Sequence, residues 1–240
     1  MTVKGSTLKW IAIVTMFIDH LAAVVLMPAW GIAGPLRLAE AWTLGDGALL
    51  TYIMRQIGRL AFPIFCFLLV EGLTHTHSRA LYLRNLLLLA VVSEILFDLC
   101  ISGRAVYGVH QSTICTLVLG FLACWGMDWL EDHTTPTYLP LKKSALLGVM
   151  MVLAWLFKTD YAAFGVALIV LLYILRSNRT EQCLLGGIVC LFGEPAAALA
   201  FLPIYLYNGE RGKQLKLLFY AFYPVHLLVL YFTRLWWLGW

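Results

Sequence analysis

Charged residues are scarce in this chain of 240 residues. Lys, Arg, Asp and Glu make up 12% of the sequence, whereas hydrophobic residues make up 62%. A soluble globular domain carries about 25% charged and about 45–50% apolar residues. The scarcity of charge therefore excludes an ordinary soluble domain, and the mean hydropathy of +0.84 indicates a polytopic membrane protein.

The alternating β-branched pattern of a membrane barrel is also missing, so backbone polar groups must be satisfied within helices. The apolar stretches are close to the roughly 20 residues that one helical crossing of a bilayer core requires. We expect an all-α polytopic integral membrane protein that forms a single transmembrane helical domain over residues 1–240, with about eight transmembrane helices in a range of roughly seven to ten. The predicted spans are residues 8–28, 57–74, 81–101, 112–130, 144–158, 160–176, 182–206 and 217–237.

Metal-binding and nucleic-acid-binding patterns are lacking as well. The six cysteines form no C-x-x-C motif and no histidines are paired at zinc spacing, so we expect small core residues and no metal site. A net charge of +4, spread over loops, suits phospholipid head groups better than nucleic acid. Lys and Arg nearly balance on the alternate sides of eight spans, so the positive-inside rule does not decide the orientation, and we expect a cytoplasmic N-terminus.

Within the apolar spans, the stretch MFIDHLAAVV places Asp19 and His20 side by side at membrane depth. Lys9 precedes His20 by eleven residues, which is about 16 Å along a helix and nearly the same face. One face of this helix therefore carries a cation at its mouth and an imidazole at mid-depth. Ionisable side chains at this depth indicate function, although polar contacts between helices are the alternative.

The second span opens with RQIGRLAFPIF, in which Arg55 and Arg59 lie one helical turn apart near the predicted membrane boundary. Two guanidinium groups at a helix mouth suit phosphate binding, and snorkelling to lipid phosphates is the alternative. Gly58 allows a close helix approach, and Pro63 either distorts the helix or begins it.

Acidic residues recur in the next spans. Glu71 and His75 in EGLTHTH are spaced i, i+4, which favours an interfacial ion pair over a metal site with His77. Glu94 and Asp98 in SEILFD share one helix face inside an apolar run. A proton relay and a buried ion pair are both consistent with that spacing.

Polar residues also interrupt the C-terminal spans. Asp160 and Tyr161 in TDYAAFG lie at a helix start, where Asp also acts as a cap. Glu194 and Pro195 break the span predicted for residues 182–206, so this segment either kinks or lines a cavity. In FYPVHLLVLY, His226 is a second imidazole that can reach the interior, with a structural role as the alternative.

The segments LKWIAIVTMFIDHLA, IGRLAFPIFCFLLVEG, YNGERG and FYPVHLLVL resemble the TraX family, membrane proteins whose named member N-acetylates conjugative pilin. The Lys9-x10-His20 spacing is also similar to the signature of the acyltransferase-3 group, which moves acyl groups from acyl-coenzyme A onto envelope sugars. The resemblance implies functional positions at Asp19, His20, Arg59 and His226. It also implies a multi-pass protein of the bacterial inner (cytoplasmic) membrane.

We therefore expect an acyltransferase that moves acetyl from acetyl-coenzyme A to an amine or hydroxyl of an unknown peptide, glycan or small-molecule acceptor. His20 is the candidate general base, because an imidazole with an ordinary pKa of about 6.5 is mostly neutral at neutral pH. Asp19 would stabilise the imidazolium indirectly or bind the acceptor amine. Arg59 or Tyr161 would hold the oxyanion, with Asp160 beside them.

The coenzyme phosphates require cations at a membrane mouth. The candidates are Lys9, Arg55 and Arg59, with Arg211 and Lys213 as an alternative cluster.

Two other classes of function stay open: a non-catalytic assembly protein, and a proton-coupled transporter, although no internal repeat of the transporter kind is found. The transport path would use Asp19, His20, Glu94, Asp98, Glu194 and His226.

Overall fold

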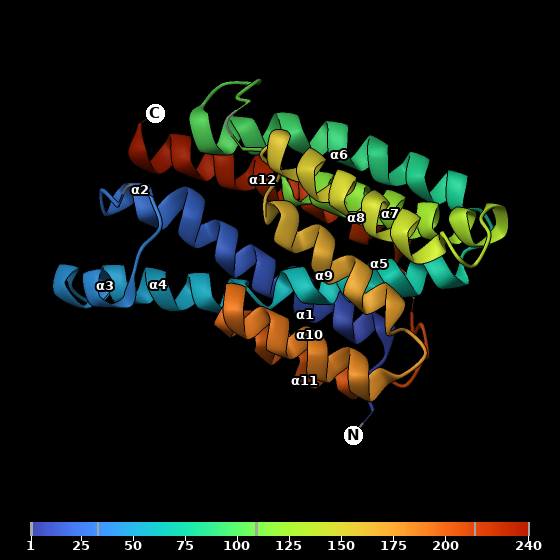
Figure 1. Ribbon diagram of the computed structural model, residues 1–240. Coiled ribbons are helices and arrows are strands. Elements are labelled where there is room, and N and C mark those ends of the chain that lie inside the picture. Colours follow the sequence, from blue (N-terminus) through green and yellow to red (C-terminus); the bar gives the residue numbers. More distant parts are fainter. Residues whose placement is uncertain (1, 33, 109, 214, 240) are drawn as a thin grey trace.

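The computed structural model describes residues 2–32, 34–108, 110–213 and 215–239, and within these ranges the chain is a bundle of helices without β-strands (Figure 1). Six helical units are long and apolar enough to cross a membrane, which confirms the all-α polytopic prediction. In chain order the elements are α1 (Gly5–Leu21), the π-helix η1 (Ala22–Leu26), α2 (Met27–Ala29), α3 (Leu38–Leu44), α4 (Asp46–Gly58), α5 (Ala61–His75), α6 (Arg79–Ser102), α7 (Thr113–His133), α8 (Leu139–Leu156), α9 (Ala162–Ile174), α10 (Arg179–Gly193), the 3-10 helix η2 (Pro195–Ala200), α11 (Phe201–Tyr205) and α12 (Lys216–Leu238).

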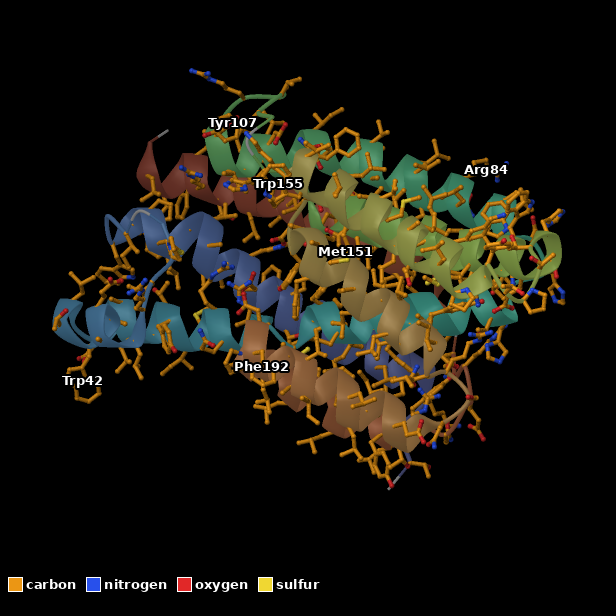
Figure 2. All side chains as sticks on the ribbon, viewed as in Figure 1. Trp42, Arg84, Tyr107, Met151, Trp155 and Phe192 are labelled. Carbon is orange, nitrogen blue, oxygen red and sulfur yellow. The ribbon has the colours of Figure 1, made fainter. Side chains whose placement is uncertain are left out.

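Large apolar side chains cover the outside of the bundle. Trp42, Trp155 and Phe192 are 73%, 68% and 89% exposed, and Figure 2 shows them on different sides of the molecule. Exposure of this kind is a liability in water and is expected where lipid chains surround a protein. Inside the bundle, Phe67 of α5 and Phe121 of α7 are fully buried and mark the centre of the apolar core.

The second membrane unit begins earlier than the sequence predicted. It runs from Asp46 to His75, with α4 ending at Gly58 and α5 beginning at Ala61, instead of starting at residue 57. Pro63 lies in the first turn of α5, where the missing N–H group does no harm. Arg55 and Arg59 consequently lie in the interior of this unit. The prediction that they mark the membrane boundary is wrong.

The span predicted for residues 182–206 is folded back on itself. Helix α10 ends at Gly193, and the chain returns beside it as η2 and α11, which confirms a break at Glu194 and Pro195. The guanidinium carbon of Arg179, at the start of α10, lies 5.3 Å from the ring centroid of Tyr207, just after α11. Both ends of this segment therefore lie at one end of the bundle, and the single predicted crossing is a re-entrant hairpin.

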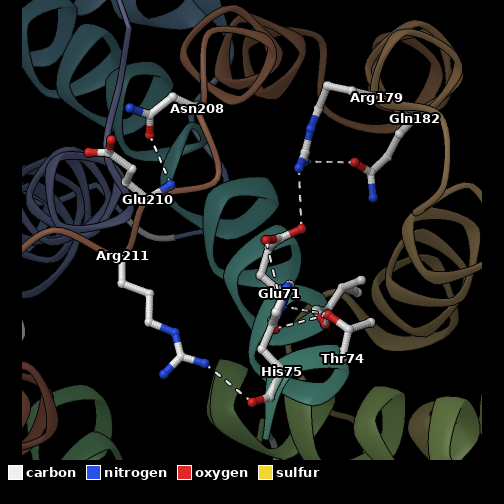
Figure 3. A network of polar contacts seen from close by, with 9 residues as sticks. Glu71, Thr74, His75, Arg179, Gln182, Asn208, Glu210 and Arg211 are labelled. Atoms are coloured by element: carbon white, nitrogen blue, oxygen red, sulfur yellow. Dashed lines mark hydrogen bonds and ion pairs between the residues drawn. The ribbon is translucent and has the colours of Figure 1, made fainter.

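Hydrogen bonds and ion pairs connect that end of the bundle, here called the N-terminal face. Arg179 donates to Glu71 at 3.2 Å and Arg211 donates to the His75 carbonyl at 3.2 Å, and both contacts are drawn as dashed lines in Figure 3. The N-terminal segment joins the same network through the Lys4–Glu210 ion pair at 2.9 Å. The ammonium of Lys4 holds the pKa of the exposed Glu210 carboxyl below its usual range.

Basic residues are concentrated at the N-terminal face. The re-entrant hairpin brings Arg211 and Lys213 to the side that already holds the basic starts of α1, α6, α8 and α10. The near balance of charge calculated from eight simple crossings is thereby replaced by an excess of Lys and Arg at the N-terminal face. The described residues on this face are Lys4, Lys9, Arg79, Arg84, Lys142, Lys143, Arg176, Arg179, Arg211 and Lys213, and those at the opposite end are Arg37, Arg104, Lys158 and Arg234.

Candidate functional site

A cavity of about 580 Å³ runs beside α1. Its lining begins at Lys9, near the N-terminal face, passes Asp19 and His20, and continues to Pro28 towards the opposite face. The volume is in the range of small-molecule sites, about 300–1,000 Å³. One cavity thus connects both halves of the bundle past the polar residues of α1.

Two histidines that are far apart in the sequence meet at the wall of this cavity. Nδ1 of His20 lies 2.6 Å from Nε2 of His226, and the planes of the two rings are nearly parallel, at an angle of 4°. Nδ1 of His226 lies 2.8 Å from the carbonyl oxygen of Phe222. Because a carbonyl only accepts, this nitrogen of His226 carries the proton, and Nε2 of the neutral ring accepts from His20. His20 is thereby held with its own Nε2 unprotonated, the form that a general base requires.

His20 and His226 differ in their access to the cavity. His20 lines it, whereas His226 is 4% exposed and packs behind His20 against the stacked ring of Phe222. The π-helix η1 begins two residues after His20, and such irregular turns are frequent at functional sites. The arrangement makes His20 the accessible imidazole and His226 its positioning residue.

Asp19 pairs with α4 instead of with His20. Its Oδ2 accepts from Nη1 of Arg55 at 2.5 Å, and both side chains are mostly buried. The other oxygen, Oδ1, is buried without a hydrogen-bond partner among the described residues. The helices approach closely here, since a Cβ added to Gly58 would lie 2.1 Å from Cβ of Asp19. The predicted close approach at Gly58 is confirmed.

Arg59, in the turn between α4 and α5, links two further elements to the site. Its Nε lies 3.3 Å from Glu194 at the end of α10, and its Nη1 donates to the Tyr161 hydroxyl at 3.4 Å. The Tyr161 ring stacks on Phe62 with ring centroids 3.8 Å apart. The guanidinium is therefore held by a carboxylate and a phenol at the depth of the histidine pair.

The turn between α8 and α9 is strained where it enters the site. Lys158, Tyr161 and Ala162 have φ angles of 53°, 62° and 38°, a region that side-chain-bearing residues rarely adopt. Asp160 in the same turn accepts a hydrogen bond from Oγ1 of Thr113 at 2.7 Å. Strain of this kind persists where the surroundings enforce it, often at functional sites. Asp160 fixes the turn that presents Tyr161 to Arg59.

Other predicted polar residues lie outside the site. Glu94 accepts from the Ser112 amide at 2.8 Å, and Asp98 accepts from the Tyr107 amide at 2.6 Å, so both carboxylates anchor the segment between α6 and α7. Neither carboxylate takes part in any ion pair between described residues. Glu71 lies at the N-terminal face with Arg179. These contacts give the three acids structural partners.

The predicted cationic cluster is divided between two depths. Lys9 lines the cavity near the N-terminal face, with its ammonium 5.1 Å from the Phe219 ring centroid. Arg55 and Arg59 accompany Asp19, about 15 Å further along α1 at 1.5 Å per residue. Arg211 and Lys213 lie at the N-terminal face with Lys9. The cations at the mouth of the cavity are therefore different residues from the two arginines at its centre.

The sequence analysis missed Tyr223 and Thr113. Tyr223 lines the cavity, and its ring lies edge-on to His20 with centroids 6.0 Å apart. The sequence signal that could have identified Tyr223 was its i, i+3 spacing from His226, which places both residues on one helix face.

Across the described residues, no group of three or more His, Cys, Asp or Glu side chains is placed to hold a metal ion.

The model of the TraX protein family matches residues 4–234. The chain belongs to the TraX family. A relative in Dichelobacter nodosus, named "Probable fimbrial assembly protein FimC, serogroup H1", is 26% identical over 255 residues, covering 93% of this chain and 92% of that protein. No solved structure matches the chain. The family match includes every residue of the site described above, from Lys9 to His226.

Proposed function

We propose that this TraX family protein is an acyltransferase that moves an acetyl group from acetyl-coenzyme A to an amine or hydroxyl of an acceptor. The observation that carries the proposal is the hydrogen-bonded relay from the Phe222 carbonyl through His226 to His20, at the wall of a cavity that connects both halves of the bundle. A base held in one tautomer by a second group is the arrangement that activates nucleophiles in acyl transfer.

In the proposed reaction the acceptor nitrogen or oxygen attacks the thioester carbonyl carbon and loses its proton to Nε2 of His20. The carbonyl electron pair moves to oxygen, and the carbon–sulfur bond breaks when this pair returns. The thiolate of coenzyme A leaves and takes up the proton from Nε2 of His20. His226 keeps His20 oriented throughout, because its own proton is bound to the Phe222 carbonyl.

The donor is expected to enter from the N-terminal face. Lys9 lines the cavity at that end, and Arg211 and Lys213 belong to the same face, so cations are available for the coenzyme phosphates. His20 lies about 16 Å deeper along α1, a separation that a long pantetheine arm is suited to bridge. A cytoplasmic N-terminal face in the bacterial inner membrane would give this mouth access to acetyl-coenzyme A.

The acceptor would reach His20 from the opposite half of the cavity. The name of the Dichelobacter nodosus relative ties that protein to fimbrial assembly, which supports a peptide acceptor over a glycan or a small molecule. Asp19 is engaged by Arg55, so its remaining oxygen Oδ1 is the atom available to receive an acceptor ammonium.

Binding and turnover of acetyl-coenzyme A by the purified protein in detergent test the proposal. We expect saturable binding and slow release of free coenzyme A that is lost in His20→Ala and retained in the matched control His75→Ala at the N-terminal face. Absence of binding, or equal release by His20→Ala, would overturn the proposal. Substrate-dependent proton flux in liposomes without an acyl donor would then favour the transport alternative.

A further inference from the structure

The oxyanion that forms during acyl transfer requires a hydrogen-bond donor close to His20, and the two groups predicted for that role make their contacts with other residues. Arg59 contacts Glu194 through Nε and Tyr161 through Nη1. The Tyr161 hydroxyl accepts from Arg59, and its ring is fixed by stacking on Phe62. None of these contacts involves His20, whereas the ring of Tyr223 contacts it edge-on.

Tyr223 of α12 has the properties of that donor. Its side chain lines the cavity, and the residue is only 6% exposed. Its hydroxyl is buried without a hydrogen-bond partner among the described residues. A buried phenol without a partner is costly, and native structures normally satisfy such a group.

The position of Tyr223 relative to both histidines is also appropriate. Its ring is edge-on to His20 with centroids 6.0 Å apart, and edge-on to His226 at 5.4 Å. Two aromatic contacts hold the phenol at the wall next to the candidate base. The hydroxyl is then oriented before a ligand arrives, as electrostatic stabilisation of a transition state requires.

We propose that Tyr223 is a catalytic residue whose hydroxyl donates a hydrogen bond to the thioester carbonyl oxygen and to the oxyanion formed from it. This inference rests on the proposed acyltransferase function. No proton leaves Tyr223 in the step: the acceptor proton goes to His20, the carbonyl electron pair moves to oxygen and back, and the carbon–sulfur bond breaks. The hydroxyl contributes only the hydrogen bond, which is stronger when the oxygen carries charge.

The test compares Tyr223→Phe with Tyr231→Phe. Tyr231 lies about two turns further along α12 and is not among the described residues that line the cavity, so its variant loses the same hydroxyl away from the binding site. The probe is acetyl-coenzyme A, with release of free coenzyme A followed in detergent and the dissociation constant measured separately. For Tyr223→Phe we expect kcat to fall by roughly 10²- to 10³-fold with little change in the dissociation constant. Tyr231→Phe should resemble the natural protein in both quantities.

Three results would count against the inference. Natural turnover by Tyr223→Phe, in a protein whose turnover depends on His20, would overturn the role of Tyr223 and leave the proposed function standing. Equal losses of binding, turnover and thermal stability in Tyr223→Phe would show a structural hydroxyl. Absence of turnover in the unaltered protein would overturn the proposed function and this inference together.

Discussion

Nδ1 of His20 lies 2.6 Å from Nε2 of His226, although the two residues belong to the first and last helices of the bundle. The contact joins α1 to α12 beside the cavity, and it determines that Nε2 of His20 is the unprotonated nitrogen. If His226 positions His20, replacing His226 should have effects on turnover that can be distinguished from the effects of replacing His20 itself.

Replacement of His226 should slow turnover without weakening donor binding. In His226→Phe the stacked ring is kept but His20 loses its acceptor, and misorientation of a catalytic group costs roughly 10²-fold in rate. His226→Gln should retain more activity, since its amide oxygen can accept the same hydrogen bond. The measurement is kcat for coenzyme A release together with the dissociation constant for acetyl-coenzyme A. Equal activity of the two variants would contradict the positioning role.

Gly58→Ala should destabilise the bundle at the contact between α1 and α4. The added Cβ would lie 2.1 Å from Cβ of Asp19, so the helices must separate, at a cost of about 1–3 kcal/mol. Gly148→Ala in α8 is the matched control, because its Cβ meets nothing within 4 Å and Ala favours helix by about 0.5–1 kcal/mol. Thermal unfolding in detergent compares the two, and similar shifts for both would argue against a close approach at Gly58.

The sequence predicted the helical fold well because apolar runs of membrane length leave few alternatives. It also located the break at Glu194 and Pro195, since a proline in a helix interior removes a backbone hydrogen bond and kinks or breaks the helix. The sequence did not predict the direction that the chain takes after that break. An apolar segment from residue 182 to residue 206 is long enough for one crossing, and only contacts such as Arg179 with Tyr207 show that it turns back.

Some residues of the site could be predicted from the sequence, but the contacts between them could not. Asp19, His20 and Arg59 were recognisable because ionisable side chains are costly at membrane depth. The depth of Arg55 and Arg59 was misjudged because α4 includes Asp46, Thr51 and Gln56, which dilute the apolar signal. The contact between His20 and His226 depends on how the first and last helices pack, which spacing within a helix does not encode.

The Asp19–Arg55 pair should show strong energetic coupling. Asp19→Asn leaves a guanidinium uncompensated in the membrane interior, and breaking a buried pair from one side costs about 3–5 kcal/mol. Arg55→Met alone should destabilise for the converse reason, and the double variant should recover much of the loss. Unfolding free energies in a double-mutant cycle measure the coupling.

The exposed pair Glu131–Lys143 serves as the comparison for that cycle. A surface ion pair contributes about 0–1 kcal/mol, so its cycle should give a coupling near the lower limit. Coupling of Asp19 to Arg55 no larger than that of Glu131 to Lys143 would mean that water reaches the Asp19 carboxylate freely.

The re-entrant hairpin makes a topological prediction that labelling can decide. Single cysteines would replace His77 and Asn208, both exposed at the N-terminal face, and Arg104 at the opposite end, in a variant without the native thiols. A membrane-impermeant maleimide applied to one side of oriented vesicles should label positions 77 and 208 together and spare position 104. Labelling of position 208 with position 104 would mean that residues 182–206 cross the bilayer once. In that case Arg211 and Lys213 would leave the face of Lys9, and the charge excess that favours a cytoplasmic N-terminal face would shrink.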